Sequence, residues 1–110
     1  MEAQATAKMV RVSPTKARLV TRLIQGRSVP EALRILKMSP KKSARIIDKV
    51  LRSAVANAAN REAIRPIELK VLVAIADEGP RLKRYRPAAR GRAMGYVKRT
   101  SHICVTVSTI

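Results

Sequence analysis

Apolar residues recur at every second position in three parts of the chain, and this period predicts three half-buried strands. The stretches run from Ala3 to Val12, from Ile67 to Ile75 and from Ser101 to Ile110. In the first, the alternation changes phase at Met9 and Val10, where we expect a β-bulge. The second is expected to place on one face Ile67, Leu69, Val71, Val73 and Ile75.

Between the first two strands, the apolar positions follow the helical period. Ser13 and Pro14 are typical of an N-cap followed by proline at the first helical position, and this helix should run to about Gln25. Gly26 can close it, because glycine tolerates the left-handed backbone that ends many helices. Its expected core face comprises Ala17, Val20, Leu23 and Ile24.

Two more helices should follow. Ser28 and Glu31 have the spacing of a capping box, which predicts a short second helix through Ala32–Leu36. Ser39–Pro40 repeats the start signal, and the third and longest helix is expected from about Lys41 to Arg61. Its outer face carries a row of cations that could track phosphates or simply be solvated: Lys41, Lys42, Arg45, Lys49 and Arg52.

These elements predict an α+β fold in which three helices pack on one face of a small three-stranded antiparallel sheet. The 110 residues suit one compact domain, so we expect a single domain over residues 1–110.

Residues 79–99 do not fit a compact domain. They hold no acid and few large apolar side chains, so the segment cannot bury itself. Since strands flank it, we predict a long, protruding β-hairpin arm that reaches roughly 30 Å, at ~3.3 Å per residue; a disordered basic loop is the alternative. Eight cations lie in it: Arg81, Lys83, Arg84, Arg86, Arg90, Arg92, Lys98 and Arg99.

The net charge limits the chemical class of the binding partner. With 24 Lys and Arg against 7 Asp and Glu, the formal net charge is +17, which calls for a polyanion: nucleic acid, an anionic membrane surface or an acidic protein. No apolar run approaches the roughly 20 residues that span a bilayer, and the first residues lack the apolar centre of a signal peptide. Cys104 is the only cysteine, which suits a reducing cytoplasm and excludes an internal disulfide.

Catalytic and metal-binding patterns are weak. His102 and Cys104 share a strand face but lack further ligands or an orienting carboxylate. Asp77 and Glu78 are adjacent, which favours a turn role with Gly79–Pro80 over a paired-carboxylate site. The only aromatic residues, Tyr85 and Tyr96, lie in the basic segment, where base stacking and cross-strand packing are equally open. We expect no enzyme activity, no metal and no cofactor.

Several motifs resemble the bacterial large-subunit ribosomal protein L-22 family, in the same order over essentially the whole chain. In the arm they are Asp77–Pro80, Leu82–Arg84, Ala89–Ala93 and Lys98–Ile103, and in the body Lys16–Val20, Lys49–Leu51 and Ser53–Ala58. The resemblance implies a structural and assembly protein with its body at the outer end of the peptide exit tunnel and a hairpin threaded through ribosomal RNA. The chain departs from the family at Ala88, where Arg is common, and at Met94–Val97, where an acid often comes first.

From the basic segment and the resemblance together, we expect the following residues to bind ribosomal RNA: Arg11, Lys16, Arg18, Arg81, Lys83, Arg84, Arg86, Arg90, Arg92, Lys98 and Arg99. The resemblance implies a tip that lines the tunnel and comprises Pro87, Ala88, Ala89, Arg90, Gly91 and Arg92. The expected partners are large-subunit ribosomal RNA, neighbouring large-subunit proteins and the nascent polypeptide, on cytoplasmic ribosomes. We expect no membrane partner and no homo-oligomer.

Two other functional classes compete. A nucleoid-type architectural DNA-binding protein would also be small and basic, and Pro87 could serve as its wedge in the minor groove. An enzyme acting on nucleic acid would need a carboxylate pair or a metal constellation that the sequence lacks. Co-migration with ribosomes or with the chromosome would separate the first class from the expected one.

Overall fold

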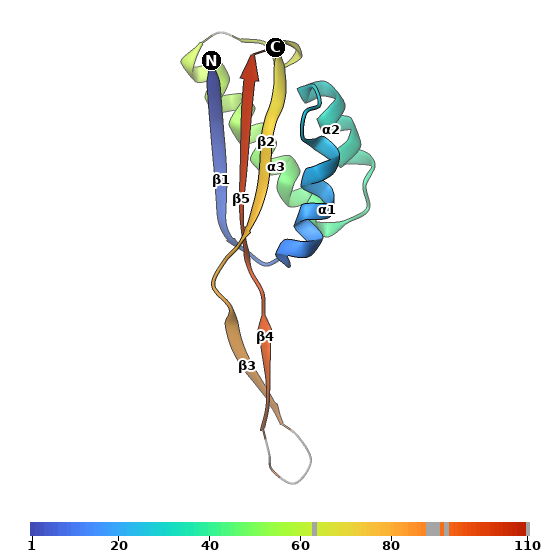
Figure 1. Cartoon of the computed structure of the whole chain (residues 1–110), viewed down its shortest axis with the longest axis vertical. Helices are drawn as coiled ribbons and strands as arrows, with labels where there is room; N and C mark the ends of the chain where they lie inside the picture. The colour runs from blue at the N-terminus through green and yellow to red at the C-terminus, as the bar shows by residue number, and fades with distance from the viewer. Residues whose placement is uncertain (63, 88–90, 92, 110) are drawn as a thin grey trace.

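The computed structural model describes residues 1–62, 64–87, 91 and 93–109. Its elements are β1 (Glu2–Val10), α1 (Pro14–Ile24), α2 (Val29–Met38), α3 (Lys42–Arg61), a short 3-10 helix (Pro66–Glu68), β2 (Leu69–Glu78), β3 (Leu82–Pro87), β4 (Ala93–Lys98) and β5 (Ser101–Thr109). A three-stranded antiparallel sheet has the order β1-β5-β2, and the helices cover one of its faces (Figure 1). β3 and β4 form a separate hairpin that protrudes from the body. The predicted α+β fold with a protruding hairpin is confirmed.

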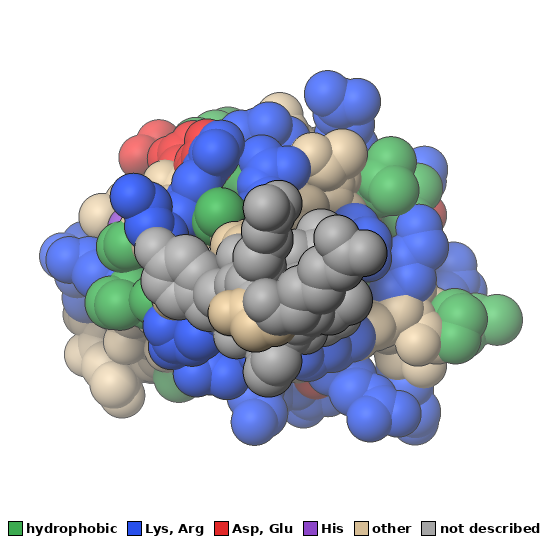
Figure 2. All heavy atoms as spheres, turned by 90° about the horizontal axis from the view of Figure 1, so that it is seen from below, with side chains coloured by type: hydrophobic (Ala, Val, Ile, Leu, Met, Phe, Trp, Pro, Cys, Tyr) green, Lys and Arg blue, Asp and Glu red, His purple; other side chains and the backbone are tan. Residues whose placement is uncertain are grey.

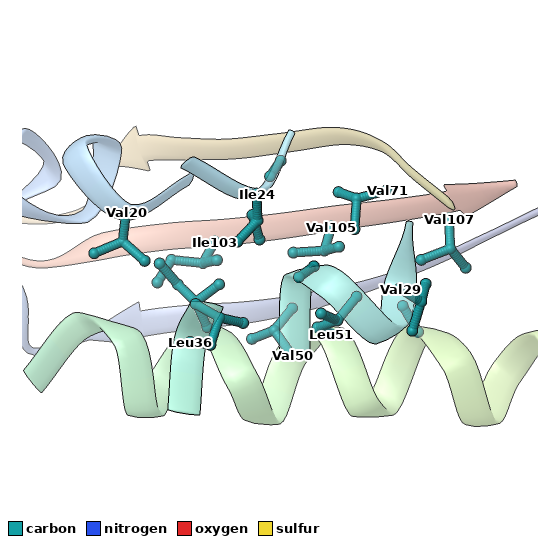
Figure 3. Packing of buried hydrophobic residues seen from close by; sticks show 14 of the residues in the cluster. Val20, Ile24, Val29, Leu36, Val50, Leu51, Val71, Ile103, Val105 and Val107 are labelled. Atoms are coloured by element: carbon teal, nitrogen blue, oxygen red, sulfur yellow. The ribbon is translucent and has the colours of Figure 1, made fainter. Parts of the chain in front are cut away.

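The core is aliphatic and centres on β5. Ile103, Val105 and Val107 alternate along the strand with no exposed surface, as the period predicts. In Figure 3, side chains of all three helices meet them, among them Ile24 and Leu51. Burying this continuous apolar layer is the main favourable contribution to folding.

The second strand departs from its predicted alternation. Its pairing with β5 shifts register between Val71 and Val73, so the extra residue reverses which positions face the helices. Beyond the shift, Ala74 and Ala76 are buried, whereas Ile75 is 43% exposed. The prediction that Val73 and Ile75 share the buried face of Leu69 and Val71 is therefore wrong. Ile67 is wrong as well, because it lies in the 3-10 helix with its side chain exposed.

The predicted bulge in the first strand is confirmed. The pairing of β1 with β5 is irregular between Ala7 and Val10, and Met9 has a left-handed backbone with φ of 55°. Its N–H donates to Nδ1 of His102 over 3.1 Å. The ring nitrogen of His102 thus supplies the acceptor that the irregular ladder cannot.

The helix ends follow the prediction more closely than the caps do. Gly26 follows α1 with φ of +82°, as expected of a closing glycine. The capping box is wrong: the Ser28 side chain makes no capping bond, and Glu31 forms an ion pair with Arg27 over 2.9 Å. The start signal at Ser39 is misplaced too, since Ser39 is the C-cap of α2 and α3 begins at Lys42 with Lys41 as its N-cap.

The expected core face of α1 is right except at one residue. Ala17, Val20 and Ile24 are fully buried, but Leu23 is 49% exposed.

Both outer edges of the three-stranded sheet are partly covered. Beside β2, the N–H of Gly26 donates to the Val71 carbonyl oxygen over 2.8 Å. Beside β1, the side-chain amide of Asn57 donates to the Gln4 carbonyl oxygen over 2.9 Å. These bonds use backbone acceptors that an additional strand would need.

Candidate nucleic-acid interface

The hairpin of β3 and β4 forms an arm that extends from the end of the sheet opposite the two chain termini (Figure 1). Its register is unbroken from the pair Leu82–Lys98 to the pair Pro87–Ala93. The departure from the family pattern at Met94–Val97 therefore leaves backbone pairing regular. The molecule is elongated, with extents of 63 × 26 × 15 Å.

Cations lie on both faces of this arm. Because neighbouring residues of a strand point to opposite faces, Lys83 lies on one face and Arg84 on the other. Lys98 is paired with Leu82 and shares the face of Arg84. All three cations are exposed, so neither face is suited to packing on an apolar surface. Two strands alone are marginally stable in water, and this arm has the charge to be stabilised by a polyanion on both sides.

The root of the arm is joined by one carboxylate. Glu78, the last residue of β2, accepts a hydrogen bond from Arg81 Nε over 2.7 Å, and Arg99 Nη2 lies 3.8 Å from the same carboxylate oxygen. The hydrogen bond and charge of Arg81, with the charge of Arg99, hold the pKa of Glu78 below its ordinary value. Both strands are thus tied where they leave the body.

Buried polar contacts complete this joint. Thr100 is 1% exposed and donates its hydroxyl to the Pro80 carbonyl oxygen. Ser101 is fully buried and donates its hydroxyl to the Val12 carbonyl oxygen. Satisfied buried hydroxyls fix geometry, because breaking either bond would leave a polar group without a partner.

In the body, the predicted RNA-binding residues are all exposed. Arg11 and Lys16 lie on either side of the start of α1, at the end of the body from which the arm extends, here called the arm end of the body. Arg18 also donates its Nε to the Ala76 carbonyl oxygen over 3.0 Å, so part of its guanidinium is used at the edge of β2. Figure 2, which looks along the arm toward the body, shows Lys and Arg side chains around most of this end.

Sequence reasoning missed how the third helix joins this group. Lys42 donates its Nζ to the Arg11 carbonyl oxygen over 3.3 Å, so the start of α3 lies beside the end of β1. The period of α3 places Lys41 and Lys42 on an outer face that could track phosphates or simply be solvated. No pattern along the sequence indicates that the start of α3 lies beside Arg11.

Some predicted residues lie outside what the structure describes. These are Ala88, Ala89, Arg90 and Arg92, together with the side chains of Tyr85, Arg86, Pro87 and Tyr96. Gly91 is described: it is exposed, its φ is +71°, and an added Cβ would meet no atom within 4 Å from the described residues beyond its chain neighbours.

The other candidates bring no catalytic arrangement together. Asp77 and Glu78 end β2 in register with His102 and Ser101, so their expected turn role is wrong. Among the described residues, no group of three or more His, Cys, Asp or Glu could hold a metal. No described helix has the length and apolarity needed to cross a membrane.

Comparison with known proteins decides the family. A family model described as "Ribosomal protein L22p/L17e" matches residues 5–108. The chain belongs to this family. It is therefore a structural ribosomal protein and not an enzyme.

Individual relatives agree over nearly their whole lengths. "Large ribosomal subunit protein uL22" of Halothermothrix orenii is 56% identical over 108 residues, which cover 98% of this chain and 96% of the relative. The protein of the same name in Carboxydothermus hydrogenoformans is 52% identical, with the same two coverages. That of Lactobacillus delbrueckii subsp. bulgaricus is also 52% identical and is covered to 92%. This ribosomal protein thus matches its relatives through body and arm alike.

Proposed function

We propose that this ribosomal protein is built into the large subunit, where it binds large-subunit ribosomal RNA and assists subunit assembly. The observation that supports this most directly is the two-stranded arm with exposed cations on both faces. A surface-lying arm would need charge on only one face. Cations on both are suited to a segment with RNA phosphates on each side.

Within this proposal the arm and the body have different roles. The arm cations Lys83, Arg84 and Lys98 neutralise phosphates along its length, with Arg86, Arg90 and Arg92 continuing toward the tip. Arg81 and Arg99 act at the root, where Glu78 already orients them. In the body, Arg11, Lys16 and Arg18 extend the same contact surface.

The tip, Pro87 to Arg92, lines the nascent-peptide exit tunnel in this proposal. Support comes from the length of the arm, from family membership and from Gly91, whose exposed left-handed backbone presents no side chain. The further partners are the nascent polypeptide and neighbouring large-subunit proteins, on cytoplasmic ribosomes.

Binding of large-subunit ribosomal RNA tests the main proposal. In filter binding, the triple variant Lys83→Gln, Arg84→Gln, Lys98→Gln should lower the steepness of the log–log salt dependence by about 2–3, at ~0.7–0.9 per lost phosphate contact. The matched control neutralises three exposed cations of α1 and α2, Arg22, Arg34 and Lys37, and should change the slope little. Equal slopes for the two triple variants would contradict an RNA-bound arm. Tighter binding to duplex DNA than to ribosomal RNA would favour the architectural DNA-binding class instead.

The tip has a separate test. Gly91→Trp should alter stalling by particular nascent peptides, or sensitivity to drugs that bind in the tunnel, while subunits still assemble. Ribosome profiling and subunit sedimentation, in a strain that carries only this variant, measure both. Normal stalling and drug response in normally assembled subunits would contradict a tip that faces the tunnel.

A further inference from the structure

A basic hollow of about 550 Å³ opens on the arm end of the body. It is lined by residues from the start of α1 and the start of α3: Arg11, Val12, Ser13, Lys16, Leu19, Lys41, Lys42 and Ser43. We call this the two-helix hollow.

Two helix N-termini contribute to this hollow, and neither has an acidic residue in its first turn. The first N–H groups of a helix lack intrahelical acceptors and give this end a partial positive charge, which normally favours nearby anions. Here Lys16 lies in the first turn of α1, and Lys42 is the first residue of α3. The remaining α-helix, α2, does not line the hollow, and it has an acidic residue, Glu31, in its first turn.

The positive charges of the hollow form no ion pairs with acidic residues in the described part of the chain. There, no salt bridge involves Arg11, Lys16, Lys41 or Lys42. Four cations and two positive helix ends thus face one space, an arrangement that opposes folding unless an anion enters.

The hydroxyl groups point to the same conclusion. Ser13 is the N-cap residue of α1, yet its side chain makes no capping bond. Ser43 is 3% exposed and lines the hollow, and no hydrogen bond joins its hydroxyl to another described residue. Because Ser43 lines the hollow, an acceptor bound there would give its hydroxyl a hydrogen-bond partner.

We propose that the two-helix hollow binds a phosphodiester group of the RNA backbone. The oxygens of the phosphate would accept from the N–H groups of Lys42 and Ser43, which precede the first α3 bond, from Ala44 to Lys41. The hydroxyl of Ser43 and the surrounding ammonium and guanidinium groups complete the site. All of these donors would bind phosphate oxygens, and none would contact a base edge. Binding at this site is therefore independent of RNA sequence.

The position of the hollow connects it with the arm. Val12 lines the hollow, and its carbonyl oxygen accepts the hydroxyl of Ser101, which lies one residue beyond the buried Thr100 of the joint. An RNA strand that leaves the root of the arm therefore passes close to the hollow. A phosphate held there would fix the orientation of the body relative to the RNA around the arm.

This inference rests on the proposed RNA binding, and Lys42→Glu tests it with two readouts of opposite sign. An acid in the first turn of α3 should raise the melting temperature by a few degrees, because it meets the helix N-terminus without a bound anion. The same variant should bind large-subunit ribosomal RNA at least tenfold more weakly, because it repels the phosphate. Lys49→Glu, the same charge change in the middle of α3, is the control and should weaken binding less without raising the melting temperature.

A second measurement uses inorganic phosphate as the probe. In the full-length protein, the backbone amide resonances of Lys42 and Ser43 should shift with added phosphate and saturate, and should stay unchanged in sodium chloride of equal ionic strength. Lys41→Gln with Lys42→Gln should abolish the shifts, and Lys37→Gln with Lys49→Gln should preserve them. If wild-type protein binds ribosomal RNA while Lys42→Glu behaves like Lys49→Glu and the amides do not shift, the phosphate site is wrong and RNA binding stands. If wild-type protein does not bind ribosomal RNA, the proposed function itself fails.

Discussion

Gly79 donates its backbone N–H to the carbonyl oxygen of Thr100 over 2.9 Å, and a Cβ at Gly79 would lie 2.6 Å from Oγ1 of Thr100. No real Cβ tolerates so short a contact, and the hydroxyl cannot simply rotate away, because it is bonded to Pro80. Glycine is therefore required at this joint for the close approach of two chain segments, and not for an unusual backbone angle.

Gly79→Ala should lower the free energy of unfolding by about 1–3 kcal/mol, as overpacking of a well-filled site does. Thermal and denaturant unfolding measure the effect. Thr100→Ala removes the oxygen that the new methyl would meet, so the loss from Gly79→Ala should be smaller in that background. Equal losses in both backgrounds would show that the contact with Thr100 is not the cause.

Substitutions at two isoleucines test whether β2 has the observed register shift or the unbroken alternation that its sequence predicts. Ile47 is fully buried in α3, and Ile47→Ala should destabilise the protein by about 2–5 kcal/mol through lost burial and a cavity. Ile75 points away from the core beyond the register shift, so Ile75→Ala should cost less than about 1 kcal/mol. Denaturant unfolding of both variants is the measurement. Comparable losses would mean that β2 lacks its bulge and buries Ile75.

The carboxylate at the arm root should make the joint sensitive to acid. Arg81 and Arg99 lower the pKa of Glu78 in the folded state, so its stabilising contribution is present above the unfolded pKa and lost as pH falls through the lower folded pKa. A carbon-detected NMR titration of Glu78 measures the shift. In Arg81→Gln the midpoint should rise toward the ordinary value; an unchanged midpoint would rule out Arg81 as the main cause.

The arm should be dispensable for folding of the body. Its strands pair only with each other, and the core cluster of described residues contains none from β3 or β4. Replacing residues 81–99 by an Asn-Gly turn should thus leave a cooperatively folded body, with a melting temperature within a few degrees of the intact protein. A shortened chain that fails to fold would refute the division into body and arm.

The sequence predicts the fold well where period and chemistry are unambiguous. Alternation along β5 identifies Ile103, Val105 and Val107 correctly, because the residues between them are the small Cys104 and the polar Thr106. From Val71 to Ala76 every residue is apolar, so the pattern contains no information on which parity faces the helices. The register shift in β2 comes from tertiary packing and could not be predicted from this segment.

The candidate site is predictable to the same limited extent. The absence of acids over residues 79–99 is local and marks the arm directly. The two-helix hollow is not local: it depends on α3 beginning beside Arg11, which lies 31 residues before Lys42. Only the folded chain shows that these cations share one space.

The covered sheet edges have a consequence for the protein before it meets RNA. Asn57 beside β1 and Gly26 beside β2 occupy backbone acceptors to which a strand of a second copy could pair, so edge-to-edge pairing of copies is hindered in the body. The outer edges of β3 and β4 pair with no other described strand, and there Lys83, Arg84 and Lys98 repel the same charges on another molecule. The cations proposed to attract RNA would therefore also keep newly made chains from forming fibrous aggregates, until phosphates replace solvent around the arm.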